Sequence, residues 1–183
     1  MSKSYIIGVS GASAAYQLPL YIARLREHTQ AKITAIVSDS ATNFVPTAVL
    51  RPFTDRLIRC KDVSLDRPYH ILVSPVEAHM LLVPASAGRI ARMAAGLCLD
   101  VLDEVLLLNY GRVHVFPSMN SRMWRSAPTQ RNIQTLINDG NHVHVHTGHA
   151  IELASGSEVE APTLPPMSEW LSLIAHIEEQ DAS

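Results

Sequence analysis

An apolar segment that passes directly into a helix through a turn of small residues dominates the sequence between residues 80 and 96. Residues 80–83 are apolar and are bounded by Pro84, as expected for a buried strand. Apolar residues then recur at helical spacing: Ile90, Met93, Ala94 and Leu97. The turn between them lets a ligand approach the backbone, and the first N–H groups of the helix favour an anion. The sequence therefore allows a phosphate site here, although a simple connecting turn would show the same pattern.

Further strands are predicted at residues 5–9, 32–37 and 113–116, and residues 105–108 are also strand-like. Helices are predicted at residues 14–28, 128–138 and 168–179. Strands that alternate with helices favour an α/β fold. We expect a single domain over residues 1–183, with a Rossmann-like (flavodoxin-like) open parallel sheet and helices on both faces.

Small and hydroxyl residues follow three successive predicted strands. The first turn holds Gly11 and Ser13 and lacks the Gly-x-Gly-x-x-Gly spacing of a dinucleotide site. The second turn contains Ser38 and Ser40, whose hydroxyls bind a phosphate or ring edge in one interpretation and cap a helix in the other. The third is the turn after residue 83. Because such turns meet at the carboxyl edge of a parallel sheet, we expect a ligand site there.

Composition excludes several classes of function. The 183 residues are 47% hydrophobic and 17% charged, with a formal net charge of −2. No basic stripe indicates nucleic-acid binding, and no apolar run of 18 residues indicates a membrane span. The two cysteines do not form a disulfide framework, and Cys98 follows the helical pattern of a core residue. Without a recognisable targeting segment, a cytoplasmic protein is expected.

Several segments leave alternatives open. Residues 45–66 contain prolines, and their arginines suggest a solvated helix face. His142, His144 and His146 alternate with valines, which favours one exposed strand face over a metal site, so no metal is expected. The amide of Asn120 either holds a carboxylate or peptide group or caps a turn. Residues 147–166 are interpreted as a flap, before a C-terminal helix and tail at 167–183.

Two motifs resemble a known family. Pro84-Ala85-Ser86-Ala87 follows one strand, and Pro117-x-Met119-Asn120-x-x-Met123-Trp124 follows another. Together they resemble the homo-oligomeric flavin-containing cysteine decarboxylases, which include phosphopantothenoylcysteine decarboxylase and the peptidyl-cysteine decarboxylases of the epidermin and mersacidin pathways. The resemblance extends over nearly the whole chain and is closest to the peptidyl-cysteine group.

The resemblance implies roles for individual residues. His70 and Asn120 would be catalytic, and Asn120, Met123, Ser155 and Gly156 would bind substrate. FMN would lie against the following residues: Gly11, Ala12, Ser13, Ser38, Ser40, Phe44, Ser86, Ala87, Gly88, Arg89 and Ser118. Gly88-Arg89 replaces the usual Asn-Thr of the family. Arg89 would pair with phosphate or point to solvent, and this departure leaves FAD as the alternative to FMN.

The implied reaction is an oxidative decarboxylation. Removal of two electrons from the substrate cysteine gives a thioaldehyde, and loss of carbon dioxide then gives an enethiol. Ser155 stands where the coenzyme A pathway enzymes carry a flap cysteine, and a hydroxyl cannot reduce the enethiol. The expected substrate is therefore a precursor peptide ending in cysteine, on the route to aminovinyl-cysteine in a ribosomally synthesised peptide.

Other interpretations remain open at this point. Phosphopantothenoylcysteine decarboxylase and a flavin-binding regulatory subunit belong to the same resemblance. A flavin prenyltransferase is a third, because Gly8-x-Ser10-Gly11-Ala12-Ser13 also resembles the opening of that group. The resemblance implies a homo-oligomer, a trimer that forms the flavin site between subunits and that can group into dodecamers.

Overall fold

A six-stranded parallel sheet forms the centre of the computed structural model, which describes residues 3–63, 71, 73, 77–151 and 158–180. Its strand order is β3-β2-β1-β4-β5-β6. The strands are β1 (Ser4–Val9), β2 (Lys32–Val37), β3 (Arg56–Arg59), β4 (His79–Ala85), β5 (Val113–Pro117) and β6 (His142–Val143). The chain order reverses between β1 and β4, which is where ligands bind in open α/β sheets. The predicted Rossmann-like α/β fold is confirmed.

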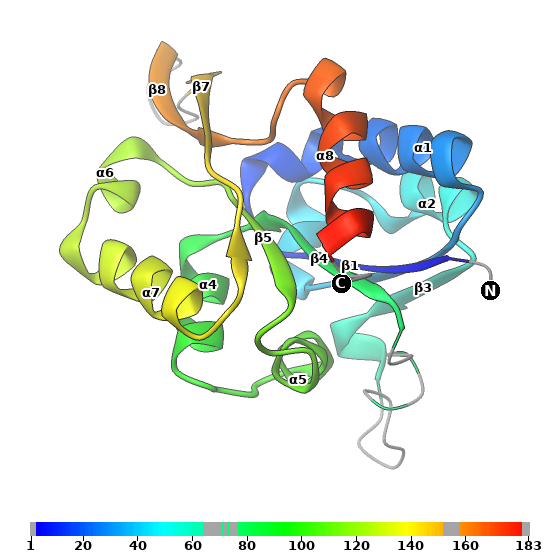
Figure 1. Cartoon of the computed structure of the whole chain (residues 1–183), viewed down its shortest axis with the longest axis horizontal. Helices are drawn as coiled ribbons and strands as arrows, with labels where there is room; N and C mark the ends of the chain where they lie inside the picture. The colour runs from blue at the N-terminus through cyan, green and yellow to red at the C-terminus, as the bar shows by residue number, and fades with distance from the viewer. Residues whose placement is uncertain (1–2, 64–70, 72, 74–76, 152–157, 181–183) are drawn as a thin grey trace.

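Helices cover both faces of this sheet (Figure 1). α1 (Leu18–Thr29), α2 (Thr47–Leu50) and α8 (Met167–Gln180) pack on one face, and α4 (Ala87–Ala94), α5 (Val101–Leu108) and α7 (Ala127–Asn138) on the other. The alternation of side chains along a strand explains the two layers, because Tyr5 and Ile7 join the first core and Ile6 joins the second. Short helical turns complete the connections: η1 (Ser13–Gln17), η2 (Asp39–Asn43), η3 (Arg51–Phe53), η4 (Cys60–Asp62) and α6 (Ser121–Trp124).

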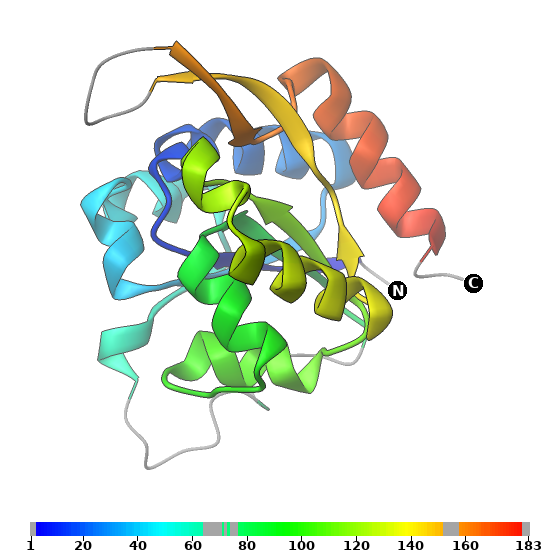
Figure 2. The same cartoon turned by 90° about the vertical axis from the view of Figure 1, so that its left-hand side faces the viewer.

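An antiparallel hairpin follows the sheet, within the segment interpreted as a flap. It consists of β7 (His146–Ile151) and β8 (Glu158–Thr163). Figure 2 shows this hairpin above α6, and β8 contacts α6. The backbone N–H of Met119 donates to the carbonyl of Pro162 at 3.4 Å. The hairpin is therefore fixed beside the segment that follows β5.

The strand predicted at residues 105–108 is wrong, because this segment belongs to α5. Asp100 caps the helix by accepting a hydrogen bond from the backbone of Asp103. The buried side chains of Val101, Leu102 and Val105 recur at helical spacing and pack into the second core. A run of four apolar residues does not by itself distinguish a strand from a buried helix.

Two further predictions fail at the ends of elements. The solvated helix face predicted within residues 45–66 is wrong for Arg56 and Arg59, which lie in the edge strand β3 with Ile58 buried, whereas Arg51 does lie in the short helical turn η3. α4 ends at Ala94, and Gly96 adopts a φ of 64°, a left-handed conformation that terminates helices. Cys98 consequently lies beyond the helix and is exposed rather than part of the core.

The three alternating histidines do not share one strand face. His142 lies in β6, His146 lies in β7, and His144 lies between the two strands. The rings of His142 and His144 stack on the buried His114 of β5, with ring centroids 4.6 and 5.2 Å away. These two side chains are half-buried, so the expectation of an exposed face is wrong for them.

Candidate functional site at the carboxyl edge of the sheet

Ser10 joins the turns that follow β1 and β4, the two strands between which the chain order reverses. Its buried hydroxyl donates to the carbonyl of Pro84 at 2.7 Å and accepts the backbone N–H of Ser86 at 2.7 Å. The position of the Ser86 turn therefore depends on a side chain 76 residues earlier. Ser10 was not among the predicted site residues, although a hydroxyl at the end of a predicted strand was a visible signal.

The turn after β2 lies against the turn after β1. A Cβ atom on Gly11 would come within 2.4 Å of the Ser40 hydroxyl, so only glycine permits this approach. Ser38 donates its backbone N–H to Val9 at 2.9 Å. Its hydroxyl accepts a hydrogen bond from the backbone of Ala41, which confirms the capping interpretation for Ser38. Ser40 is exposed and shares a 3.2 Å hydrogen bond with the Ser38 hydroxyl.

The N-terminus of α4 opens onto the same edge. Ser86 caps it, accepting the backbone N–H of Arg89 at 3.4 Å. The N–H groups of Ala87 and Gly88 lie in the first turn of α4, where the helix itself provides no carbonyl to accept a hydrogen bond from them. Gly88 is exposed, and nothing lies within 4 Å of the position where a Cβ would stand. Free N–H groups beside open space are suited to a phosphate or another anion.

Arg89 does not take either of the two orientations expected for it. Its side chain is 1% exposed and forms a two-pronged ion pair with Asp100, with both N–O distances at 2.8 Å. It also contacts the buried carboxylate of Asp103. Burial opposes the charge, but the hydrogen bonds and charges of the two carboxylates outweigh it and raise the pKa of Arg89. The guanidinium therefore stays charged and faces neither a phosphate nor the solvent.

The turn after β5 completes the edge. Ser118 is buried, and its backbone N–H donates to the carbonyl of Ala85 at 2.9 Å. Asn120 caps α6, and its Oδ1 accepts the backbone N–H of Arg122 at 2.8 Å. The prediction that Asn120 caps a turn is therefore confirmed. Met123, on α6, is 49% exposed.

The structure therefore brings together the predicted residues of four turns, which contain Gly11, Ser38, Ser40, Ser86 and Ser118. Ala12 is buried, Ser13 begins η1, and the half-buried Phe44 packs against the core around α1. The predicted residues His70, Ser155 and Gly156 lie outside the described residues.

Two other structural findings bear on the class of the site. Among the described residues, no three His, Cys, Asp or Glu side chains are grouped so that they could hold a metal ion. In the same part of the chain, no helix combines the length and the apolar character needed to cross a membrane.

Comparisons with known proteins agree with this architecture. The epidermin decarboxylase of Staphylococcus epidermidis is 33% identical over 164 residues, which cover 87% of this chain and 87% of that protein. The coenzyme A biosynthesis bifunctional protein CoaBC of Vibrio cholerae is also 33% identical and covers 96% of this chain, but the chain spans only 43% of that protein. A solved structure of a histidine-to-asparagine variant of EpiD, complexed with the substrate peptide DSYTC, aligns with a TM-score of 0.83, 28% identity, and coverage of 96% of this chain and 99% of that chain.

A family model gives the assignment. The model described as Flavoprotein matches residues 1–179, which is nearly the whole chain. The epidermin decarboxylase is similar over most of its own length as well. The chain therefore belongs to the Flavoprotein family, and its cofactor is a flavin.

Proposed function

We propose that this protein is an FMN-dependent decarboxylase that converts a C-terminal cysteine of a peptide into an enethiol. The observation that carries the proposal is the similarity to epidermin decarboxylase across most of both chains. The substrate peptide bound in the EpiD complex, DSYTC, ends in cysteine. FMN is supported further by TvaF, a protein of the same fold that is described as an FMN-dependent cysteine decarboxylase.

The described residues fit a flavin with a single phosphate. The N–H groups of Ala87 and Gly88 would hold the phosphate, because they open onto free space at the start of α4. The hydroxyls of Ser40 and Ser86 would add hydrogen bonds from the neighbouring turns. Arg89 does not take part, because both of its terminal nitrogens are held by the carboxylates of Asp100 and Asp103. The proposed phosphate-binding site therefore consists of backbone N–H groups and hydroxyls.

The flavin, when bound, would accept two electrons from the Cβ–S unit of the substrate cysteine. We assign to Asn120 the binding of the substrate carboxylate, because an amide both donates and accepts at the edge of the site. We assign to His70, on the family resemblance, the handling of the thiol proton. The β7–β8 hairpin beside α6 would cover the peptide and exclude water while carbon dioxide departs.

The alternative is a phosphopantothenoylcysteine decarboxylase. It is supported by CoaBC, whose sequence identity to this chain equals that of epidermin decarboxylase. The two functions differ in the product. A coenzyme A pathway enzyme returns electrons to the enethiol through a flap cysteine, whereas this chain has Ser155. The enethiol is therefore the product expected here, and a peptide is the favoured substrate.

Mass spectrometry of peptides incubated with the FMN-loaded protein tests the proposal. A peptide ending in cysteine should lose about 46 mass units, for carbon dioxide and two hydrogens. The same peptide with a terminal serine, or with an amidated C-terminus, should remain intact. Unchanged peptides over a broad range of sequences, together with turnover of phosphopantothenoylcysteine, would favour the alternative.

A further inference from the structure

Two arginines, one on α6 and one at its C-cap, place positive charge next to the segment that follows β5. Arg122 and Arg125 are exposed, and no carboxylate of the described residues lies within 4.0 Å of either guanidinium. Ion pairs are present instead at Lys3, Arg24, Arg26, Arg59, Arg89 and Arg92. Because the two residues are three positions apart in a helical turn, they share one face. The two guanidinium groups place two positive charges on this face, while the neighbouring strand β8 carries the exposed Glu160.

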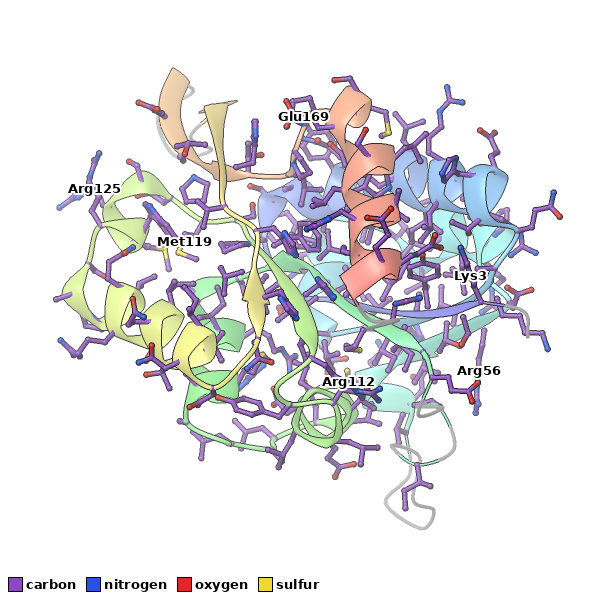
Figure 3. The ribbon with its side chains drawn as sticks, in the orientation of Figure 1. Lys3, Arg56, Arg112, Met119, Arg125 and Glu169 are labelled. Atoms are coloured by element: carbon purple, nitrogen blue, oxygen red, sulfur yellow. The ribbon has the colours of Figure 1, made fainter. Side chains whose placement is uncertain are left out.

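The position of α6 places this charge beside the candidate site. α6 begins at its cap, Asn120, and packs against β8 of the hairpin. Figure 3 shows Arg125 pointing away from the body of the protein at the outer end of α6, while Met119 points inward. Met123 lies between the two arginines in sequence and is 49% exposed. We call Arg122, Met123 and Arg125 the α6 surface.

We infer that the α6 surface binds an acidic side chain of the peptide substrate, a few residues before its terminal cysteine. The inference rests on the proposed function, which places the substrate carboxylate at Asn120. From residue 120 to 125 a helix rises about 7.5 Å. An extended peptide covers about 3.3 Å per residue, so the arginines would meet the second or third residue before the cysteine. Met123 offers an apolar contact to the stem of that side chain.

The size of the effect follows from the exposure of both arginines. An exposed ion pair of about 0.2–1 kcal/mol corresponds to about a 1.4- to 5-fold change in affinity. Two independent pairs would give about 2- to 25-fold, and because both arginines share one carboxylate we expect a preference for the acidic peptide of about 3- to 10-fold. Screening by salt should reduce this preference, because the pair is solvent-exposed.

The test compares two peptides that end in cysteine and differ only by Glu or Gln at the second and third positions before it. For the FMN-loaded wild-type protein, KM should be about 3- to 10-fold lower for the Glu peptide, with similar kcat. The double variant Arg122→Gln/Arg125→Gln should give equal KM values and an unchanged kcat for the Gln peptide. Arg51→Gln is the matched control, because Arg51 is an exposed arginine on η3, which leads to the opposite edge of the sheet.

Several outcomes would overturn the inference. One is an equal KM for both peptides in the wild-type protein, and another is a preference for Glu that survives in the double variant. A double variant impaired only toward phosphopantothenoylcysteine would assign the surface to a phosphate instead. If no peptide is turned over, the proposed function fails, and calorimetry with terminal-serine versions of the two peptides still decides the inference. Equal dissociation constants there would also refute it.

Discussion

The hydroxyl of Ser10 accepts the backbone N–H of Ser86 at 2.7 Å and donates to the carbonyl of Pro84 at the same distance. Through these two bonds, the end of β1 fixes the turn that leads from β4 into α4. The N–H groups suited to the flavin phosphate lie in that turn. A side chain that need not touch the ligand therefore sets the shape of its binding site.

Replacing Ser10 with alanine should weaken flavin binding and destabilise the protein. The variant leaves the half-buried N–H of Ser86 without its acceptor, at a cost of about 1 kcal/mol. Urea unfolding of the apoprotein measures the stability, and titration with FMN followed by fluorescence measures the affinity. Ser4→Ala is the control, because Ser4 begins β1 and its hydroxyl has no hydrogen-bond partner among the described residues. A Ser10→Ala protein that matches this control in both measurements would contradict the prediction.

Replacing Arg89 with methionine should be among the most destabilising single changes. It leaves the partly exposed carboxylate of Asp100 without its ion-pair partner and the buried carboxylate of Asp103 with Arg92 alone, and breaking a buried pair typically costs about 3–5 kcal/mol. Removing one carboxylate as well, in Arg89→Met/Asp103→Asn, should restore part of the loss. Arg24→Met breaks an exposed pair with Glu27 and should change the free energy of unfolding by no more than about 1 kcal/mol. Equal effects of the two single variants in urea unfolding would refute the importance of burial.

Acid should destabilise the protein through His144 before it reaches the carboxylates. Burial, followed by the charges of His114, His142 and His176, lowers the pKa of His144 from 6.5 to about 4. Between these two pH values His144 is protonated in the unfolded chain but neutral in the folded protein. The free energy of unfolding therefore falls as the pH drops from 6.5 towards 4. Above 6.5 this residue adds no pH dependence.

Thermal melts at several pH values across that window provide the measurement. His144→Gln should show a shallower loss of Tm between pH 6.5 and 4 than the wild-type protein. His28→Gln is the control, because His28 is exposed on α1 and should leave the slope unchanged. Asp100 contributes to the acid response only below about pH 5: although burial raises its pKa, the hydrogen bond and charge of Arg89 lower it below 3.8 overall. Identical slopes in all three proteins would show that His144 does not control the acid response.

Asn120 has a structural role and a proposed substrate role, and substitution can separate them. Aspartate is as good a helix cap as asparagine, so Asn120→Asp should retain the hydrogen bond to Arg122 and change stability by less than about 0.5 kcal/mol. Its negative charge would repel the substrate carboxylate and abolish decarboxylation of the cysteine peptide. Asn120→Ala should lose both, with about 1 kcal/mol of stability. Full activity in Asn120→Asp would remove Asn120 from the site.

Substitution of His70 tests the residue that the resemblance places at the reacting thiol. His70→Asn should keep flavin absorbance and bind the cysteine peptide with unchanged affinity, because an amide still forms hydrogen bonds. Decarboxylation should fall by about 10²- to 10⁴-fold, the usual contribution of a positioned acid or base. Single-turnover measurements with mass detection would show this. Retention of wild-type turnover would exclude His70 from proton transfer.

The sequence predicted the architecture because its strongest patterns are local. The strand at residues 32–37 was predicted with the bounds that β2 shows, and the predicted helix at 128–138 differs from α7 by one residue. The turns at Gly11, Ser38 and Ser86 were also identified, since small residues after an apolar strand need no tertiary context. Where the pattern was short, as at residues 105–108, local information could not separate a buried helix from a strand.

Partnerships between distant side chains were decided by the tertiary structure alone. The sequence shows that Arg89 follows the Ser86 turn, but only the packing of α5 against α4 brings Asp100 and Asp103 to its guanidinium. The histidines 142 and 144 likewise alternate in sequence, yet their surroundings depend on His114 in the neighbouring strand. Charge and burial are properties of the folded neighbourhood, so a sequence can name the residues of a site before it can say which groups remain free to bind a ligand.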